Sequence, residues 1–241
     1  MTLLSIEHVG KTHWVGPYEK RVLTDVTLEM RAGDLFGVWG AQRSGKSTLL
    51  RIAAGIEAPD AGRVCFDGTD LATVSKTQRD RLRLDEIGLV QGAGPQSSTL
   101  CVLDYVALPL FGRCKRHEAR SRALAALRRL DVVECRDALW HQLSDGEKTL
   151  VNLAHALVRR PRLLLVDDPT AGLDTLQQQE VVELLRAFAT RDGVAVLMTS
   201  SVLSTITDAH DAFTLSDGRL IPVTDATRRS GEVIAFPRDE Q

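Results

Sequence analysis

The strongest constraint on the fold is a buried strand pattern that runs directly into a glycine-rich turn and then a helix. Residues 34–39 form the strand pattern, and an apolar helical pattern continues to Ala54. The turn between them has the spacing Gly40-x4-Gly45-Lys46-Ser47, in which backbone N–H groups at a helix N-terminus surround phosphate oxygens. The pattern predicts an α/β core that binds a nucleotide polyphosphate through Gly40, Arg43, Ser44, Gly45, Lys46, Ser47 and Thr48.

Two further buried strand patterns, residues 162–167 and 194–199, are separated by a helical pattern that ends near Thr190. Strands that alternate with helices predict a mainly parallel sheet. Asp167 ends the first of these strands, and nucleotide sites use such a carboxylate to anchor Mg²⁺. A lone aspartate after a strand is more commonly a turn or helix cap, but its combination with Lys46 and Ser47 favours a metal ligand.

The rest of the chain divides into a β-rich opening and a helical middle. Residues 3–9 and 21–30 alternate as half-buried strands do, and residues 13–18 between them are expected to form a loop. Residues 77–140 are helical in character. Residues 225–241 are expected to form a polar tail.

Composition narrows the class of protein. Lys and Arg total 30 against 32 Asp and Glu, a net charge of −2, so nucleic acid is not the expected partner. No stretch approaches the ~20 apolar residues of a membrane span, and the N-terminus does not resemble a signal peptide, so we expect a cytoplasmic chain. The four cysteines are far apart in sequence, which favours reduced structural thiols over a metal site.

A third motif adds a family resemblance. Residues 143–147, Leu-Ser-Asp-Gly-Glu, precede an alanine-bearing helical pattern, and the chain here resembles the ATP-binding subunits of ABC transporters. The resemblance covers nearly the whole chain and includes the run from Asp167 to Asp174 and the turn at residues 216–220. Residues 102–110 further resemble the branch of lipoprotein-release and macrolide-export ATPases, the LolD/MacB-like branch.

The resemblance implies a single ABC ATPase domain over residues 1–224, with an N-terminal antiparallel β subdomain and a helical insertion at about residues 89–157. It implies ATP and Mg²⁺ as ligands, and a head-to-tail dimer that moves a separate membrane permease from the cytoplasmic face of the membrane. His13 stands where the family has its adenine-stacking aromatic, with Trp14 beside it as a second nucleotide-binding candidate and Tyr18 nearby. Gln91 is a further candidate for Mg²⁺. The signature residues that would face the partner's ATP are Ser144, Asp145, Gly146 and Glu147, with Asp174 in the D-loop.

The chain departs from the family pattern at positions that serve hydrolysis. Asp168 replaces the glutamate that deprotonates the attacking water, and Ser200 replaces the switch histidine. Gly92 aligns with the Q-loop glutamine, so that Gln91 lies one residue early. Asp145 replaces the first signature glycine, and Arg43 replaces a glycine of the phosphate loop, where it strains the turn but adds a cation. Together these changes predict an ATP-binding subunit with weak hydrolysis at its own site.

Two functions from different classes remain open at this stage. The first is a transport ATPase subunit, in which residues 89–110 contact the permease. The second is a regulatory or structural subunit that binds nucleotide without turnover. A soluble ABC protein of repair or translation is disfavoured by the single cassette and the absence of excess basic charge, and a small-molecule kinase would not need residues 143–147.

Overall fold

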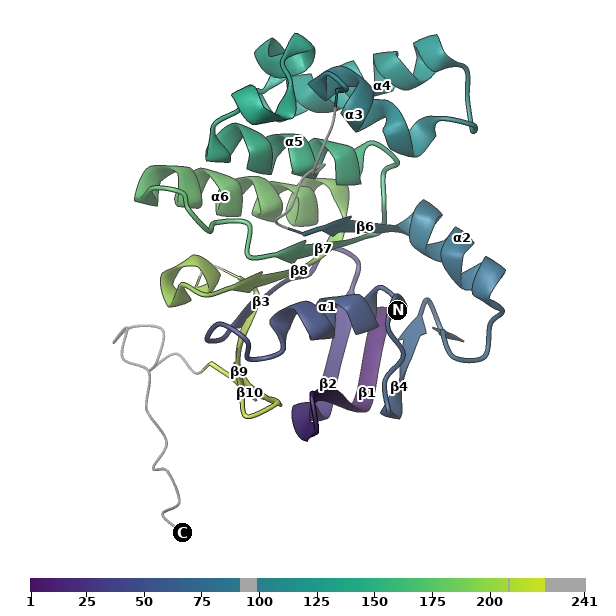
Figure 1. Cartoon of the computed structure of the whole chain (residues 1–241), viewed down its shortest axis with the longest axis vertical. Coiled ribbons are helices and arrows are strands. Elements are labelled where there is room, and N and C mark those ends of the chain that lie inside the picture. The colour runs from purple at the N-terminus through teal and green to yellow at the C-terminus, as the bar shows by residue number, and fades with distance from the viewer. Residues whose placement is uncertain (92–98, 208, 224–241) are drawn as a thin grey trace.

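The computed structural model describes residues 1–91, 99–207 and 209–223, which form two sheets with helices between and around them (Figure 1). The central sheet has the strand order β10-β9-β3-β8-β7-β6. Its parallel strands are β6 (Ile87–Val90), β7 (Leu163–Asp167), β8 (Ala195–Ser200), β3 (Leu35–Trp39) and β9 (Asp211–Ser216). Strand β10 (Arg219–Pro222) closes one edge antiparallel to β9. The predicted α/β fold with a mainly parallel sheet is confirmed.

The N-terminal strands form the second, antiparallel sheet. Its members, in the order β2-β1-β4-β5, are β2 (Tyr18–Arg31), β1 (Thr2–Val15), β4 (Ala61–Phe66) and β5 (Thr69–Asp70). The loop expected at residues 13–18 is wrong, because β1 and β2 continue to a tight turn at Gly16 and Pro17. Gly16 has φ +62°, and the pairing of the flanking residues satisfies backbone groups that a loop would leave to water.

Helix α1 (Lys46–Ala53) lies between the two sheets, as Figure 1 shows. Leu49, Leu50 and Ile52 are buried there in one cluster with residues of both sheets, such as Ile6 of β1 and Leu165 of β7. The opposite face of the central sheet is covered by α5 (Asp145–Leu157) and α6 (Thr175–Asp192), whose apolar side chains share a second cluster with β7 and β8.

The remaining helices are α2 (Lys76–Glu86), α3 (Val102–Ala107) and α4 (Arg116–Arg129), with short 3₁₀ turns at Leu108–Leu110, Val133–Asp137, Trp140–Gln142 and Leu203–Ile206. The expectation of helical character throughout residues 77–140 is too broad, because β6 interrupts it. This four-residue apolar run completes the hydrogen bonds of β7, which would otherwise be an open sheet edge. Residues 92–98 and the expected tail lie outside the described residues. Among the helices within the described ranges, none has both the length and the apolar character of a membrane span.

A cluster of rings joins α3 to α5. The Tyr105 ring stacks on His155 with centroids 4.6 Å apart and contacts Trp140 edge-on at 5.6 Å. The Tyr105 hydroxyl donates a hydrogen bond to Asn152 Oδ1 at 3.0 Å. Burial, with a smaller contribution from the Arg159 cation, lowers the pKa of His155 to about 4, and burial raises the pKa of Tyr105 to about 12. The packing of α3 on α5 therefore requires a neutral imidazole.

The folded chain should lose stability as the pH falls from 6.5 toward 4, because the unfolded state binds a proton at His155 that the folded state excludes. His155→Phe should retain the ring packing and lose less stability than the wild type, by roughly 2 kcal/mol between pH 7 and pH 5. Urea unfolding of both proteins at pH 7 and pH 5 measures the difference. Equal losses in the two proteins would contradict the assignment, since the titration of carboxylates is common to both.

Candidate nucleotide site

The predicted site elements meet at one edge of the central sheet. The glycine-rich loop begins where β3 ends, and Asp167 ends β7, with β8 hydrogen-bonded between the two strands. Trp39 is in register with Ser200, and Asp167 with Thr199, so the three strand ends are level. Ligand sites of parallel sheets form at this edge, where the carboxyl ends of the strands meet.

The glycines of the loop are required by its geometry. Gly45 has φ +108°, and a Cβ there would lie 2.8 Å from the carbonyl oxygen of Val22. A Cβ at Gly40 would lie 2.5 Å from Ser44 Oγ. Arg43 has φ +64° although it carries a side chain, so the strain expected at this position is present.

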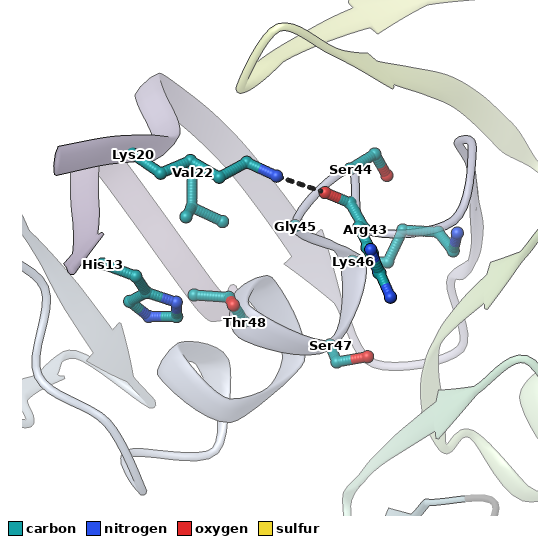
Figure 2. Close-up of a pocket in the computed structure, with 9 residues that line it drawn as sticks. All are labelled: His13, Lys20, Val22, Arg43, Ser44, Gly45, Lys46, Ser47 and Thr48. Carbon is teal, nitrogen blue, oxygen red and sulfur yellow. Dashed lines mark hydrogen bonds between the residues drawn. The ribbon is translucent and has the colours of Figure 1, made fainter. Parts of the chain in front are cut away.

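The loop forms one wall of a cavity of about 290 Å³, shown in Figure 2. Its lining comprises His13, Lys20, Val22, Arg43, Ser44, Gly45, Lys46, Ser47 and Thr48. His13 is thus brought to the loop, as expected of the family's aromatic position. Its Nε2 atom is 2.8 Å from Glu57 Oε1, which fixes the ring from outside the cavity.

Trp14, the other nucleotide-binding candidate of this segment, does not line this cavity. Successive side chains of a strand point to opposite faces, so Trp14 faces away from His13, and it is 70% exposed. Lys20 and Val22 were missed in the sequence because they come from the neighbouring strand. The pairing of His13 with Lys20 across the hairpin places both side chains on one face, and only a correct hairpin register reveals it.

The polar groups of the loop suit an anion. Lys46 is only 7% exposed, and its Nζ donates hydrogen bonds to the carbonyl oxygens of Gly40 at 2.6 Å and Ala41 at 3.0 Å. The buried Ser44 hydroxyl has no hydrogen-bond partner within the part of the chain that the structure describes. A buried hydroxyl without a partner and a buried ammonium, both from residues that line the cavity, fit a phosphate group that accepts from both.

Two groups with the chemistry of Mg²⁺ ligands lie near this loop. Ser47 has an exposed hydroxyl in the first turn of α1, and Asp167 Oδ1 accepts a hydrogen bond from Thr199 Oγ1 at 2.8 Å. Thr199 holds the carboxylate by one oxygen and leaves the other for a metal ion. Gln91 is exposed directly after β6, at the same sheet edge, and Gly92 lies outside the described residues.

Asp168 contacts Ser201 and not Ser200. Its carboxylate accepts hydrogen bonds from Ser201 Oγ at 2.7 Å and from the Ser201 backbone N–H at 3.3 Å. Ser200 is fully buried, and its hydroxyl oxygen accepts hydrogen bonds from the Val202 N–H at 3.0 Å and from Thr205 Oγ1 at 2.7 Å. The Ser200 hydroxyl is therefore engaged inside the protein by the segment that follows β8. Alternation at the end of β8 brings the next residue, Ser201, to Asp168 instead.

The signature residues begin α5 with a capping box. Ser144 Oγ accepts a hydrogen bond from the Glu147 N–H at 3.3 Å, and Glu147 Oε2 accepts from the Ser144 N–H at 2.7 Å. The Cys135 thiol donates to Glu147 Oε1 at 3.0 Å. This hydrogen bond, and to a smaller extent those from Ser144, lowers the pKa of Glu147. Burial and the nearby Glu147 carboxylate raise the pKa of Cys135 to about 11. Lys148 Nζ pairs with Asp145 at 2.9 Å.

The D-loop leads into α6 beside this cap. Asp174 Oδ1 accepts a hydrogen bond from the Gln177 N–H at 2.9 Å and is exposed. A Cβ on Gly146 would lie 3.1 Å from Gln177 Nε2, so the N-termini of α5 and α6 are neighbours. Ser144, Asp145 and Asp174 therefore form one exposed surface, separate from the cavity lining.

Comparison with known proteins identifies this arrangement. A family model described as ABC transporter matches residues 23–171. The lipoprotein-releasing system ATP-binding protein LolD of Bordetella pertussis is 34% identical over 220 residues, which are 91% of this chain and 95% of LolD. The methionine import ATP-binding protein MetN of Vibrio vulnificus is 30% identical over 240 residues, 99% of this chain and 68% of MetN.

Solved structures agree with these relatives. A dimeric ATP-binding cassette in a post-hydrolysis state with ADP and Pi superimposes with a TM-score of 0.83 at 27% identity, over 90% of this chain and 96% of the cassette. CbiO1 of Clostridium perfringens, part of the transporter complex CbiONQ, gives a TM-score of 0.79 at 27% identity, over 91% and 87% of the two chains. This chain belongs to the family of ABC transporter ATP-binding subunits.

Proposed function

We propose that this chain is the ATP-binding subunit of a transport complex, in which it couples ATP binding to a separate membrane permease while its own site hydrolyses ATP weakly. The observation that carries the nucleotide assignment is the cavity that His13, Ser44 and Lys46 line together, in which the Ser44 hydroxyl has no hydrogen-bond partner among the described residues. The relatives LolD and MetN are named as ATP-binding proteins of a releasing and an import system, which supports a transport role. The proposed place of action is the cytoplasmic face of the membrane, without a nucleic-acid partner.

Lys46→Ala should weaken ATP binding at least a hundredfold, because it removes the buried ammonium that meets the phosphates. Isothermal titration calorimetry with Mg-ATP measures the change, and thermal unfolding of the variant verifies that it is folded. Equal affinities of the folded variant and the wild type would contradict the assignment of the site.

Weak hydrolysis follows from three features of the site. The Asp168 side chain is one methylene shorter than glutamate, and displacements near 1 Å cost about a hundredfold in rate. Its carboxylate is also held by two hydrogen bonds from Ser201, which leave it poorly placed to accept a proton from water. The buried Ser200 supplies no group to the γ-phosphate. When bound, Mg²⁺ would be held by Ser47, Asp167 and, we propose, Gln91, and would neutralise phosphate charge.

The isolated chain should therefore hydrolyse ATP far more slowly than relatives that retain the glutamate and histidine. Asp168→Glu should raise the rate of hydrolysis less than tenfold. Ser200 still replaces the switch histidine and Asp145 still replaces the signature glycine in the two sites of the dimer. Single-turnover assays at saturating ATP measure these rates, and Lys46→Ala gives the background. A substantial basal rate that Asp168→Ala lowers by several orders of magnitude would show that Asp168 is a working base.

The partner of the cassette is proposed to be a second ATP-binding subunit, docked head to tail. Ser144, Asp145 and Gly146 would then face the ATP of that subunit from the N-terminus of α5. The Asp145 carboxylate opposes an approaching phosphate, and its ion pair with Lys148 offsets only part of this repulsion. A more orthodox ATPase as partner would leave one working site, whereas a homodimer would favour the regulatory, non-hydrolysing alternative. Identification of the subunits that copurify with the tagged chain distinguishes the two.

The permease contact is proposed at residues 108–111, the corner that directly follows α3. In the described part of residues 89–110, Val106 and Leu110 are buried in the core of the helical part, so they do not contribute contact surface. Leu108 and Phe111 are 40% and 37% exposed on the turn at Leu108–Leu110 and just after it. The structure thus separates the core residues of this segment from its exposed apolar pair.

Leu108→Asp with Phe111→Asp should release the chain from membranes that contain its permease, because charges at an apolar contact are costly to bury. ATP affinity should remain within twofold of the wild type, since the corner lies outside the cavity lining. Membrane pelleting and calorimetry measure the two properties. Tyr18→Asp, at a more exposed aromatic side chain of the β1–β2 hairpin, is the control. Unchanged pelleting of the double variant would rule out this interface.

A further inference from the structure

Among the residues that the structure describes, three cationic side chains line the nucleotide cavity, and no aspartate or glutamate does. Lys46 is the one that the phosphate-loop motif requires. Arg43 comes from the loop itself, and Lys20 comes from β2 of the other sheet. Like charges that share a cavity repel one another unless an anion lies among them. The lining therefore carries more positive charge than one lysine of a phosphate loop supplies.

Lys20 reaches the loop across the boundary between the two sheets. It lies directly opposite His13 in the β1–β2 ladder, so both side chains point to the cavity. Its Nζ donates a long hydrogen bond of 3.4 Å to the carbonyl oxygen of Arg43, as Figure 2 shows. An ammonium group has three donors, and this weak bond leaves it able to turn toward a stronger acceptor.

Arg43 has a strained backbone conformation within the loop. Its φ of +64° is unfavourable for a residue with a side chain, and the carbonyl that receives the Lys20 bond belongs to the same residue. Its side chain lines the same cavity as Lys46 and Ser47 (Figure 2). Guanidinium groups bind phosphate through two parallel hydrogen bonds, whereas the Lys46 ammonium already donates to two loop carbonyls.

We propose that Lys20 and Arg43 form a second phosphate-binding pair, additional to Lys46, which binds the polyphosphate of the nucleotide and makes affinity increase steeply with its charge. This inference rests on the proposed function, because it concerns the same site. Lys20 joins the antiparallel sheet to the phosphates, so nucleotide binding draws β2 and the loop together. Arg43 offsets the strain of its backbone with a direct contact to the ligand.

The experiment measures the affinities of ATP, ADP and AMP by calorimetry at two salt concentrations. Lys20→Met should weaken ATP binding about tenfold and AMP binding less than threefold, and should reduce the salt dependence for ATP. Lys20→Arg should restore most of the affinity. Arg43→Gly should also weaken ATP binding about tenfold, although it removes the backbone strain and should raise the unfolding temperature.

Arg21→Met is the matched control, since Arg21 is the exposed neighbour of Lys20 on the opposite face of β2. If Lys20→Met and Arg21→Met weaken ATP binding equally, the effect comes from the overall surface charge, and the proposal is overturned. Unchanged or tighter ATP binding by Lys20→Met and Arg43→Gly would also overturn it, and tighter binding would show that the two cations obstruct the site. If Lys46→Ala abolishes binding while these variants retain it, the proposed function stands and the second pair does not. If the wild type binds no ATP, both fail.

Discussion

Helix α1 packs with its apolar side chains between two sheets, and the position of its N-terminus follows from this burial. Leu49 and Leu50 are completely buried, and they belong to a cluster that includes strands of both sheets. A helix held on two sides cannot rotate or slide without opening a cavity, which is costly in a close-packed core. The loop before it is confined in turn, since Gly45 lies so close to Val22 that no side chain fits. The buried ammonium of Lys46 and the orphaned hydroxyl of Ser44 are presented by this fixed loop.

The level ends of β3, β8 and β7 provide the second half of the site. Their register places Thr199 against Asp167 and brings Ser201 to Asp168. Each carboxylate thus accepts a hydrogen bond from a hydroxyl group at the end of strand β8, Asp167 from Thr199 and Asp168 from Ser201. Thr199 donates to one oxygen of Asp167, and the other oxygen is the one proposed to bind Mg²⁺. Both oxygens of Asp168 accept hydrogen bonds from Ser201. This arrangement supports the proposal that the site holds Mg-ATP and hydrolyses it weakly.

The start of α5 shows how one residue pattern can serve both folding and function. Ser144 and Glu147 satisfy N–H groups at the start of the helix through their capping box, and Cys135 holds the same glutamate from the 3₁₀ turn at Val133–Asp137. These contacts give a local structural reason for both residues that does not depend on a partner's ATP. They also keep the N-terminus of α5 ordered and exposed, which is the condition for contact with a second subunit. In the proposed head-to-tail dimer, the exposed carboxylate of Asp145 would oppose such a contact by its charge.

The sequence by itself determined the elements whose signals are local. The loop glycines, Lys46 and Ser47 follow from a spacing that only a strand-to-helix turn satisfies, and Asp167 follows from its place at the end of an apolar run. The tertiary structure alone decided which side chains face each other. The hairpin register places Lys20 in the cavity lining and Trp14 outside it. Ser201, rather than Ser200, contacts Asp168, because a strand turns successive side chains to opposite faces. A shift of one residue reverses every such assignment. The strands that pair with β8 lie far away in the chain, and the β1–β2 register depends on the position of a two-residue turn inside a segment that the sequence pattern indicated as a loop.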